Sequence, residues 1–177
     1  MFQFCPKCGR EGTVQQLDTT NHECSNCQWH FWNNAKGCVA VAFVKGDRLL
    51  VSKRGRETDP SYGKYDLVGG FVDFDESAQD AAIREVLEET GIELTHDDLE
   101  LADIYKNHYN DEISTIDVTF IVRNWRWETP KAGNDDSAGF EWQPLSFIYD
   151  ENFWQNYDGL DQKILASQHK SQHKSQE

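Results

Sequence analysis

One segment of the chain, residues 70–92, concentrates acidic side chains on a short predicted helix. It reads GFVDFDESAQDAAIREVLEETGI. Ser77, followed three residues later by Asp80, forms a pattern like a capping box at a helix start. Gly91 suits the left-handed turn that ends many helices. The pattern therefore predicts a helix from Ala78 to Thr90.

The predicted helix has an apolar face and an acidic flank. At about 100° per residue, its packing positions gather on one side, and they are Ala78, Ala82, Ile83, Val86, Leu87 and Thr90. Glu85, Glu88 and Glu89 lie on the flank, where they repel one another and oppose the helix dipole. A cation is expected beside them, and Mg²⁺ with a substrate phosphate is the leading hypothesis. The alternative is a solvated acidic face that is neutralised by Arg84 and distant lysines.

A glycine pair stands just before this helix. Gly69 and Gly70 interrupt the apolar, strand-like run 65–72. Glycine permits sharp turning and the close approach of backbone to a ligand. This context favours the metal and phosphate hypothesis.

The spacing from Gly70 to Ile92, G-x5-E-x7-R-E-V-L-E-E-T-G-I, matches the signature box of the Nudix hydrolases. The chain thus resembles that family. The resemblance implies an α/β/α sandwich with a mixed β-sheet, and hydrolysis of a nucleoside diphosphate linked to another group with Mg²⁺ or Mn²⁺. Val68 and Asp75 stand where Pro and Gly are frequent in the family, and neither departure removes a charged group.

The resemblance also implies roles by position. Glu85 and Glu89 resemble the principal metal ligands, and Glu88 an additional ligand or water contact. Arg84 would orient these acids. Glu76 would brace the loop or contact metal-bound water. The carbonyl group of Gly69 or Gly70 would complete the metal shell.

Three residues outside the box are further candidates. Arg54 resembles the family arginine that reaches a substrate phosphate, with an ordinary surface residue as the alternative. Tyr109 stands where diadenosine polyphosphate hydrolases often carry Tyr, and core packing is its alternative. Asp136, six residues before Trp142, is the preferred general base, and its competitors are Asp135 and Glu141.

The N-terminus carries a second metal motif. Cys5 and Cys8 form one CxxC pair, and Cys24 and Cys27 form another after 15 intervening residues. This spacing predicts a structural, tetrahedral Zn²⁺ site of the zinc-ribbon type. Disulfides are the alternative, and they are disfavoured by the leftover Cys38, which we expect to be a buried apolar residue.

Length and composition predict two domains and a tail. The 177 residues leave room for a zinc ribbon over 1–35 and a Nudix domain over 36–166. The stretch 167–177 repeats SQHK, which is typical of a disordered polar tail. No apolar run approaches the roughly 18 residues of a membrane span, and no signal peptide is recognised, so we expect a cytoplasmic protein.

Charge argues against a nucleic-acid reader. The chain has 17 Lys and Arg against 31 Asp and Glu, for a net charge of -14. We expect a small nucleotide substrate, with no nucleic-acid polymer and no membrane as partner. The ribbon is expected to pack on the catalytic domain or to help form a homodimer.

Alternation and turn residues predict the remaining elements. The expected strands are 38–45, 48–53, 101–108, 113–122 and 139–145. The last of these resembles the family strand that ends in Trp and enters a final helix, which we expect at 146–165.

The substrate is less constrained than the reaction. Zinc ribbons precede the Nudix domain in NADH pyrophosphatases, and the segment after Cys24 is similar to the ribbon exit of that group, but the SQPWPFP-like segment of those enzymes is absent. We expect a dinucleotide or ADP-ribose-like substrate such as NADH, ADP-ribose, FAD or a diadenosine polyphosphate. The products would be a nucleoside monophosphate and a phosphorylated remainder. The alternatives are a housecleaning hydrolase of damaged nucleoside triphosphates, a nucleotide sensor, or a zinc-ribbon interaction protein.

Overall fold

The chain divides into two compact units. The computed structural model describes residues 2–109, 113–123, 125–130, 137–155 and 157–166. One unit is Met1–Ala35 and the other is Lys36–Glu177. None of the helices in these described ranges is long and apolar enough to cross a membrane.

The first unit is a small antiparallel sheet. Its strands are β1 (Val14–Gln16), β2 (Asn21–Cys24) and β3 (His30–Trp32), in that order. Aromatic rings supply its packing: the Phe2 ring lies edge-on to Trp29 and Phe31, with centroids 5.5 and 5.1 Å away. Such a small unit buries little apolar surface, so a metal is a natural source of extra stability.

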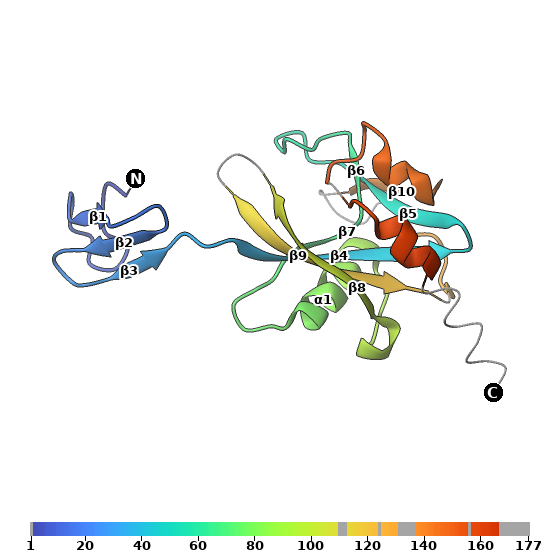
Figure 1. Ribbon diagram of the computed structural model, residues 1–177, viewed down its shortest axis with the longest axis horizontal. Coiled ribbons are helices and arrows are strands. Elements are labelled where there is room, and N and C mark those ends of the chain that lie inside the picture. The colour runs from blue at the N-terminus through green and yellow to red at the C-terminus, as the bar shows by residue number, and fades with distance from the viewer. Residues whose placement is uncertain (1, 110–112, 124, 131–136, 156, 167–177) are drawn as a thin grey trace. The chain divides into compact units, whose positions relative to one another are not determined.

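The second unit is built on a mixed sheet (Figure 1). Its strands are β4 (Lys36–Lys45), β5 (Arg48–Arg54), β6 (Tyr65–Asp66), β7 (Val68–Phe71), β8 (Glu100–His108), β9 (Ser114–Val122) and β10 (Ser137–Pro144). The main path runs β10-β5-β4-β9-β8, and β4 and β9 are parallel while the other pairs are antiparallel. The expected α/β class with a mixed sheet is confirmed.

The sheet opens beside β4. The end of β4 pairs with β5 at Val44 and Lys45, whereas its first half pairs with β7 at Cys38 to Val41. The far end of β5 pairs with β6 instead. Strands β4 and β5 therefore diverge, and β6 and β7 enter between them.

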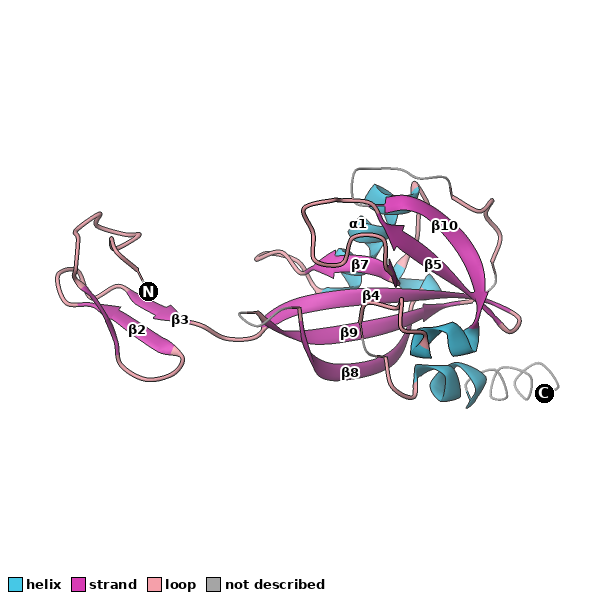
Figure 2. Cartoon of the chain, turned by 90° about the horizontal axis from the view of Figure 1, so that it is seen from above, coloured by secondary structure: helices cyan, strands magenta, loops and turns pink. Residues whose placement is uncertain are grey.

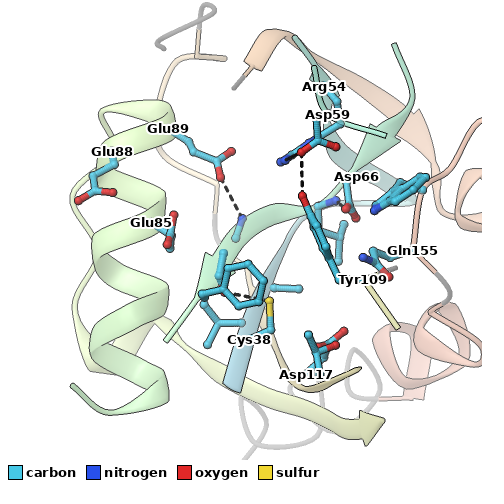
Figure 3. Close-up of a pocket in the computed structure, with 18 of the residues that line it drawn as sticks. Cys38, Arg54, Asp59, Asp66, Glu85, Glu88, Glu89, Tyr109, Asp117 and Gln155 are labelled. Carbon is cyan, nitrogen blue, oxygen red and sulfur yellow. Dashed lines mark hydrogen bonds and ion pairs between the residues drawn. The ribbon is translucent and has the colours of Figure 1, made fainter. Parts of the chain in front are cut away.

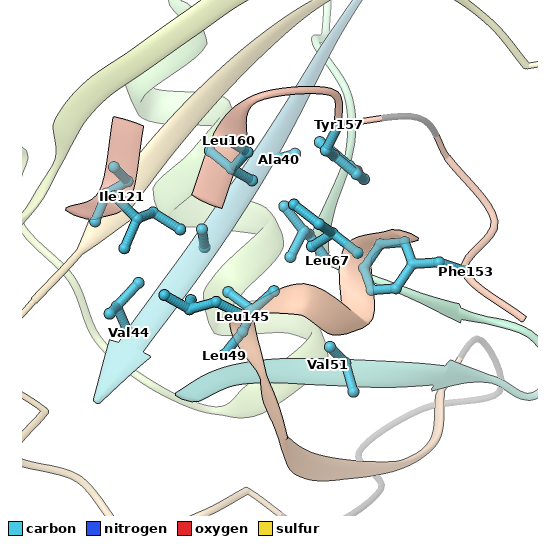
Figure 4. Packing of buried hydrophobic residues seen from close by; sticks show 13 residues of the cluster. Ala40, Val44, Leu49, Val51, Leu67, Ile121, Leu145, Phe153, Tyr157 and Leu160 are labelled. Carbon is cyan, nitrogen blue, oxygen red and sulfur yellow. The ribbon is translucent and has the colours of Figure 1, made fainter. Parts of the chain in front are cut away.

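Both faces of the sheet are covered, which explains why β4 reads as a continuous apolar run. Val39, Val41 and Phe43 pack on the side of helix α1 (Ala78–Thr90). The alternating residues Ala40 and Ala42 pack on the opposite side (Figure 4), where η2 (Leu145–Tyr149) and a helix at 160–166 lie. Figure 2 shows strands β4, β9 and β8 side by side in this layered arrangement. A short 3₁₀ turn, η1 (His96–Asp98), leads into β8.

The expected single helix at 146–165 is wrong. Helical structure occurs as η2 and again at 160–166, with an irregular segment between them. In that segment the Asn152 carbonyl accepts from the Tyr65 amide, with an N···O distance of 2.8 Å. The Trp154 amide donates to the Tyr65 carbonyl at 2.7 Å. Asp150 also accepts from the Asn152 amide at 2.9 Å. These bonds replace the helical ones, so the segment follows β6 rather than continuing the helix.

Candidate active site

Helix α1 has the predicted bounds, and its two ends are held as expected. The Ser77 hydroxyl accepts from the Asp80 amide at 3.1 Å, and the Asp80 carboxylate accepts from the Ser77 amide at 3.3 Å. Gly91 ends the helix with a φ of 73°. Buried Ala82 and Val86 lie on the sheet side of the helix. The caps fix where the helix begins and ends, and the packed face fixes its rotation. Together they determine which side chains point away from the sheet contact.

A cavity of about 320 Å³ lies beside α1 (Figure 3). It is lined by residues of β4, β7 and α1 and by the ends of β5 and β6. It brings together these residues that were predicted from the sequence: Arg54, Gly69, Gly70, Arg84, Glu85, Glu88, Glu89 and Tyr109. Residues more than 50 positions apart in the chain thus meet at one site.

Glu89 is the most unusual acid of the cavity. Glu89 is only 5% exposed, and the Gly69 amide N–H donates to its Oε1 atom at 3.3 Å. Burial raises the pKa of this carboxyl group to about 8, although the nearby Arg54 charge opposes the shift. A buried carboxylate of this kind needs a cation beside it to remain ionised. Together with Glu85 and Glu88, Glu89 offers the oxygen-rich donor set that a hard divalent ion prefers.

Arg84 ties the acids of the box together. Its Nη1 atom donates to Glu85 at 2.8 Å and to Glu88 at 3.3 Å. Its Nε and Nη2 atoms both donate to Glu76, at 3.1 and 2.6 Å, and Nη2 also reaches the Phe71 carbonyl at 3.0 Å. The neighbouring acids raise the pKa of Arg84, and Glu76 contributes most. The guanidinium is therefore placed to orient the carboxylates.

Glu76 faces Arg84 and the loop rather than the cavity. Besides Arg84, it accepts from the Asp73 amide at 2.8 Å. It is not among the described residues that line the cavity. This position matches bracing of the loop, and a contact of Glu76 with the metal or its bound water stays a prediction.

The glycine pair lies against two different groups. A Cβ atom on Gly69 would meet the Val39 carbonyl oxygen of β4 at 2.0 Å, whereas one on Gly70 would meet Glu85 Oε1 at 2.4 Å. The Gly70 carbonyl accepts from the thiol of Cys38 at 3.0 Å. A side chain at Gly69 would thus collide with backbone, whereas one at Gly70 would displace the Glu85 carboxylate.

Arg54 and Tyr109 meet through an acid that the sequence reading missed. The Tyr109 hydroxyl donates to Asp59 Oδ2 at 2.7 Å, and Arg54 Nη2 lies 3.8 Å from the same oxygen. Arg54 Nε also donates to the Ser61 hydroxyl at 3.1 Å. Arg54 lines the cavity and is not an ordinary surface residue.

The cavity has further polar residues that were not predicted. They include Asp59, Asp66, Asp117, Trp154 and Gln155. Burial raises the pKa of Asp66 to about 6, and the Tyr157 hydroxyl donates to its carboxyl group at 2.9 Å. A signal existed for Asp117, because Thr115, Asp117 and Thr119 place polar side chains at every second position of β9. Nothing local in the sequence marked the others.

The predicted general base cannot be placed. Asp136 and its neighbour Asp135 lie outside the described residues. Glu141, the other competitor, is on β10, where it accepts from Gln143 at 2.9 Å. It is not among the described residues of the cavity wall.

Trp125 and Trp127 pack against the core. The rings of Trp125 and Trp127 lie edge-on to Phe43, with centroids 5.5 and 6.3 Å away. Trp125 also contacts Trp142 at 4.9 Å. These rings belong to the apolar cluster on the α1 side of the sheet.

The four N-terminal cysteines form a compact cluster. The sulfur atoms of Cys5, Cys8, Cys24 and Cys27 all lie within 4.8 Å of one another. The Cys5–Cys27 and Cys8–Cys24 sulfur pairs are 3.7 and 3.8 Å apart. Tetrahedral Zn–S bonds of about 2.3 Å would place sulfur atoms about 3.8 Å apart, whereas a disulfide requires about 2.05 Å. The geometry therefore fits one Zn²⁺ ion with four thiolate ligands.

Cys38 is not part of that cluster. It lies on β4 at the cavity wall, and burial raises the pKa of its thiol to about 12. It pairs with Gly70 as described above, so its environment is more polar than the apolar one expected for it.

Comparison with known proteins identifies the fold and the family. The family model of the NUDIX domain matches residues 33–163. The chain belongs to the Nudix family. Enzymes of the family use divalent metals. The crystal structure of a Nudix hydrolase from Nitrosomonas europaea has a TM-score of 0.65 at 22% identity, covering 92% of this chain and 88% of the other.

The names of two relatives and of one structural neighbour refer to nucleotides. The NAD-capped RNA hydrolase NudC of Haemophilus influenzae (strain PittGG) is 34% identical over 92 residues, 52% of this chain and 34% of that protein. NudC of Vibrio cholerae is 33% identical over 97 residues, again covering 34% of the relative. The matches thus span about a third of the length of these curated relatives. The Nudix domain of Shewanella oneidensis NrtR complexed with ADP ribose has a TM-score of 0.60 at 16% identity, covering 76% of this chain and 88% of that one.

One expectation from charge needs correction. The net charge of -14 was used to exclude a nucleic-acid polymer as partner. The NudC relatives are named as hydrolases of capped RNA, so that exclusion is not supported. Net charge describes the average field of a molecule, and a site can still hold the end of an RNA locally.

Proposed function

We propose that this Nudix hydrolase cleaves the diphosphate linkage in nucleoside diphosphates that are joined to another group. The products would be a nucleoside monophosphate and a phosphorylated remainder. The observation that carries the proposal is the buried Glu89 carboxyl group, which shares one cavity with Glu85, Glu88 and Arg54. Several acids and an arginine around one space suit a substrate that brings both negative phosphates and a metal ion.

The box residues take the following roles in the proposal. Glu85, Glu88 and Glu89 would hold Mg²⁺ or Mn²⁺, and Arg84 would keep two of these carboxylates in place. When bound, the ion would neutralise the diphosphate and lower the pKa of a water molecule. Arg54 would contact a phosphate oxygen from the β5 end of the cavity. Asp136 is retained as the proposed general base.

The proposed substrate class is a dinucleotide or an ADP-ribose-like compound. The NudC name of the relatives and the ADP ribose in the NrtR structure support this class. The NudC name also gives the NAD-capped end of an RNA as a second candidate. Damaged nucleoside triphosphates are the remaining alternative within the hydrolases.

Replacing Glu89 with Gln tests the metal assignment. The change keeps the size of the side chain but removes the charge that would bind the ion. We expect kcat to fall by at least about a hundredfold with Mg²⁺, while the melting temperature stays within a few degrees of wild type. Glu93→Gln, at an exposed position just after the helix, is the matched control and should retain activity. Near-normal turnover by Glu89→Gln would contradict the assignment.

A substrate panel tests the reaction. NADH, NAD, ADP-ribose, FAD, diadenosine polyphosphates, damaged dNTPs and a NAD-capped oligoribonucleotide would be incubated with Mg²⁺ or Mn²⁺, and their products identified. We expect a nucleoside monophosphate from at least one compound with an internal diphosphate. Turnover of triphosphates alone would support the housecleaning alternative, and no turnover of any compound would support a nucleotide sensor.

A further inference from the structure

Among the described residues of the cavity wall, two buried polar atoms have no hydrogen-bond partner. One is Oδ1 of Asp117, a residue that is only 6% exposed, and the other is Nε1 of Trp154. Both residues line the same cavity as the box glutamates. A buried polar atom without a partner costs about 1–3 kcal/mol, so native proteins rarely leave one unexplained. Here an acceptor and a donor are left unpaired at one site.

The unpaired acceptor has a fixed orientation. Asn107 Nδ2 donates to the other carboxylate oxygen of Asp117 at 3.1 Å, and to Gln155 Oε1 at 2.6 Å. Strands β4 and β9 hold Asp117 beside Cys38, since these two residues are partners in the parallel pairing. Figure 3 shows Asp117 and Gln155 across the cavity from Glu88 and Glu89. The free oxygen is therefore a preformed acceptor, away from the acids of the proposed metal site.

The chemistry of these atoms limits what would satisfy them. A carboxylate oxygen only accepts and an indole N–H only donates. The edge of a nucleobase with an exocyclic amine presents an N–H donor next to a ring acceptor, fixed in one plane. A ribose hydroxyl is the competing partner, because it can accept and donate as well. The presence of one donor and one acceptor in the same cavity favours the base.

We propose that Asp117 and Trp154 form a base-recognition subsite that selects a nucleotide with an amino-bearing nucleobase. Asp117 accepts a hydrogen bond from the exocyclic amine, and Trp154 donates to an acceptor on the base. This subsite rests on the proposed function, since it assumes that the diphosphate of the same substrate lies near the box glutamates. It would set which nucleotide end enters the cavity.

Exchange of Asp117 for Asn reverses the polarity of the subsite. Because Asn107 donates to one oxygen of the carboxylate, the variant amide would turn its own oxygen toward Asn107. Its NH₂ group would then face the cavity in place of the acceptor. An amino-bearing base would meet a donor where it needs an acceptor.

The affinities of product nucleotides measure directly whether the site prefers a base with an exocyclic amine. AMP and purine riboside monophosphate, which lacks the amine, would be titrated calorimetrically into the full chain with Mg²⁺, and UMP would serve as a pyrimidine without an amine. We expect wild type to bind AMP at least about fivefold more tightly than the purine analogue. Asp117→Asn should reduce that ratio to about one or invert it. Asp103→Asn on β8, which instead breaks an ion pair with Lys163 of the helix at 160–166, is the control and should keep the wild-type ratio.

Three results would overturn the subsite. Equal binding of AMP and the purine analogue by wild type would show that the amine is not read. A uniform loss of affinity in Asp117→Asn, with the ratio unchanged, would indicate a ribose contact or a structural role. Failure of all the nucleotides to bind at millimolar concentration would also reject it. Hydrolysis of the substrate panel is measured separately on the same sample, so the subsite can fail while the proposed reaction holds.

Discussion

Gly69 and Gly70 are neighbours in the chain, yet a side chain at each would disturb a different part of the molecule. At position 69 the new atom would press on the backbone of β4, which cannot move without breaking the β4–β7 pairing. At position 70 it would press on the end of the Glu85 side chain, which can rotate away. One glycine thus supports the fold and the other leaves room for a proposed metal ligand.

This difference predicts opposite outcomes for two alanine substitutions. Gly69→Ala should lower the free energy of unfolding by about 1–3 kcal/mol or more, because overpacking against backbone is costly. Gly70→Ala should keep stability near wild type but reduce kcat at least about tenfold, because it displaces the Glu85 carboxylate. Urea unfolding and steady-state kinetics of both variants check this. Unchanged activity of a folded Gly70→Ala protein would argue against Glu85 as a ligand.

At the scale of elements, short-range capping and long-range pairing meet in η1. Asp98 accepts from the Thr95 amide at 2.9 Å, which closes the turn. It also accepts from Nη1 and Nη2 of Arg126, at 2.9 and 3.2 Å. One carboxylate therefore joins the turn before β8 to the segment after β9. A cap that looks local in the sequence is in fact a tertiary contact.

The Asp98 pairing predicts a specific pH dependence of stability. Hydrogen bonds from Arg126, followed by that from Thr95, lower the pKa of Asp98 from 3.8 to about 2. The ionised form stabilises the fold, so its contribution is complete above about pH 4 and is lost as the pH falls toward 2. Asp98→Asn should therefore be less stable than wild type at pH 7, and the difference should shrink between pH 4 and pH 2. Urea unfolding across this range checks it.

The neighbouring Asp97 supplies the control for that experiment. It is exposed on the same turn, so Asp97→Asn should change stability little at pH 7. A stability difference between Asp98→Asn and wild type that stays constant down to pH 2 would contradict the assigned pairing.

At the scale of the whole molecule, the two units are stabilised by different means. The unit Lys36–Glu177 has apolar clusters on both faces of its sheet. The unit Met1–Ala35 has a few aromatic contacts and a four-cysteine cluster. We expect the large core to hold its fold without a metal, and the small sheet to depend on an ion bound by the four thiolates.

Metal removal should destabilise the unit Met1–Ala35 and leave the unit Lys36–Glu177 folded. We expect about one tightly bound zinc per chain after purification under reducing conditions. A strong chelator at neutral pH should then expose the backbone amides of β1 to β3 to hydrogen exchange, while those of β4 and β9 stay protected. Cys8→Ser should produce the same pattern without a chelator. Absence of zinc, or equal loss of protection in both units, would contradict this division.

By itself, the sequence determined the features that depend on residues close together in the chain. The bounds of α1 follow from its caps, the strands from alternation, and the cysteine cluster from paired CxxC spacing. The signature box identified the family before any distance was known. These signals are local, because capping, pleating and ligand spacing act over a few residues.

Only the tertiary structure decided which distant side chains share the cavity. Asp117 reaches it because β9 lies parallel to β4, and Trp154 because the segment before it pairs with Tyr65 instead of forming the expected helix. Asp59 joins Arg54 to Tyr109 across 50 residues. Contacts between side chains that are far apart in the chain depend on strand pairing and on burial between remote segments. No local sequence pattern encodes these contacts. The sequence alone therefore identified the family, and the fold brought together the residues proposed to select the substrate.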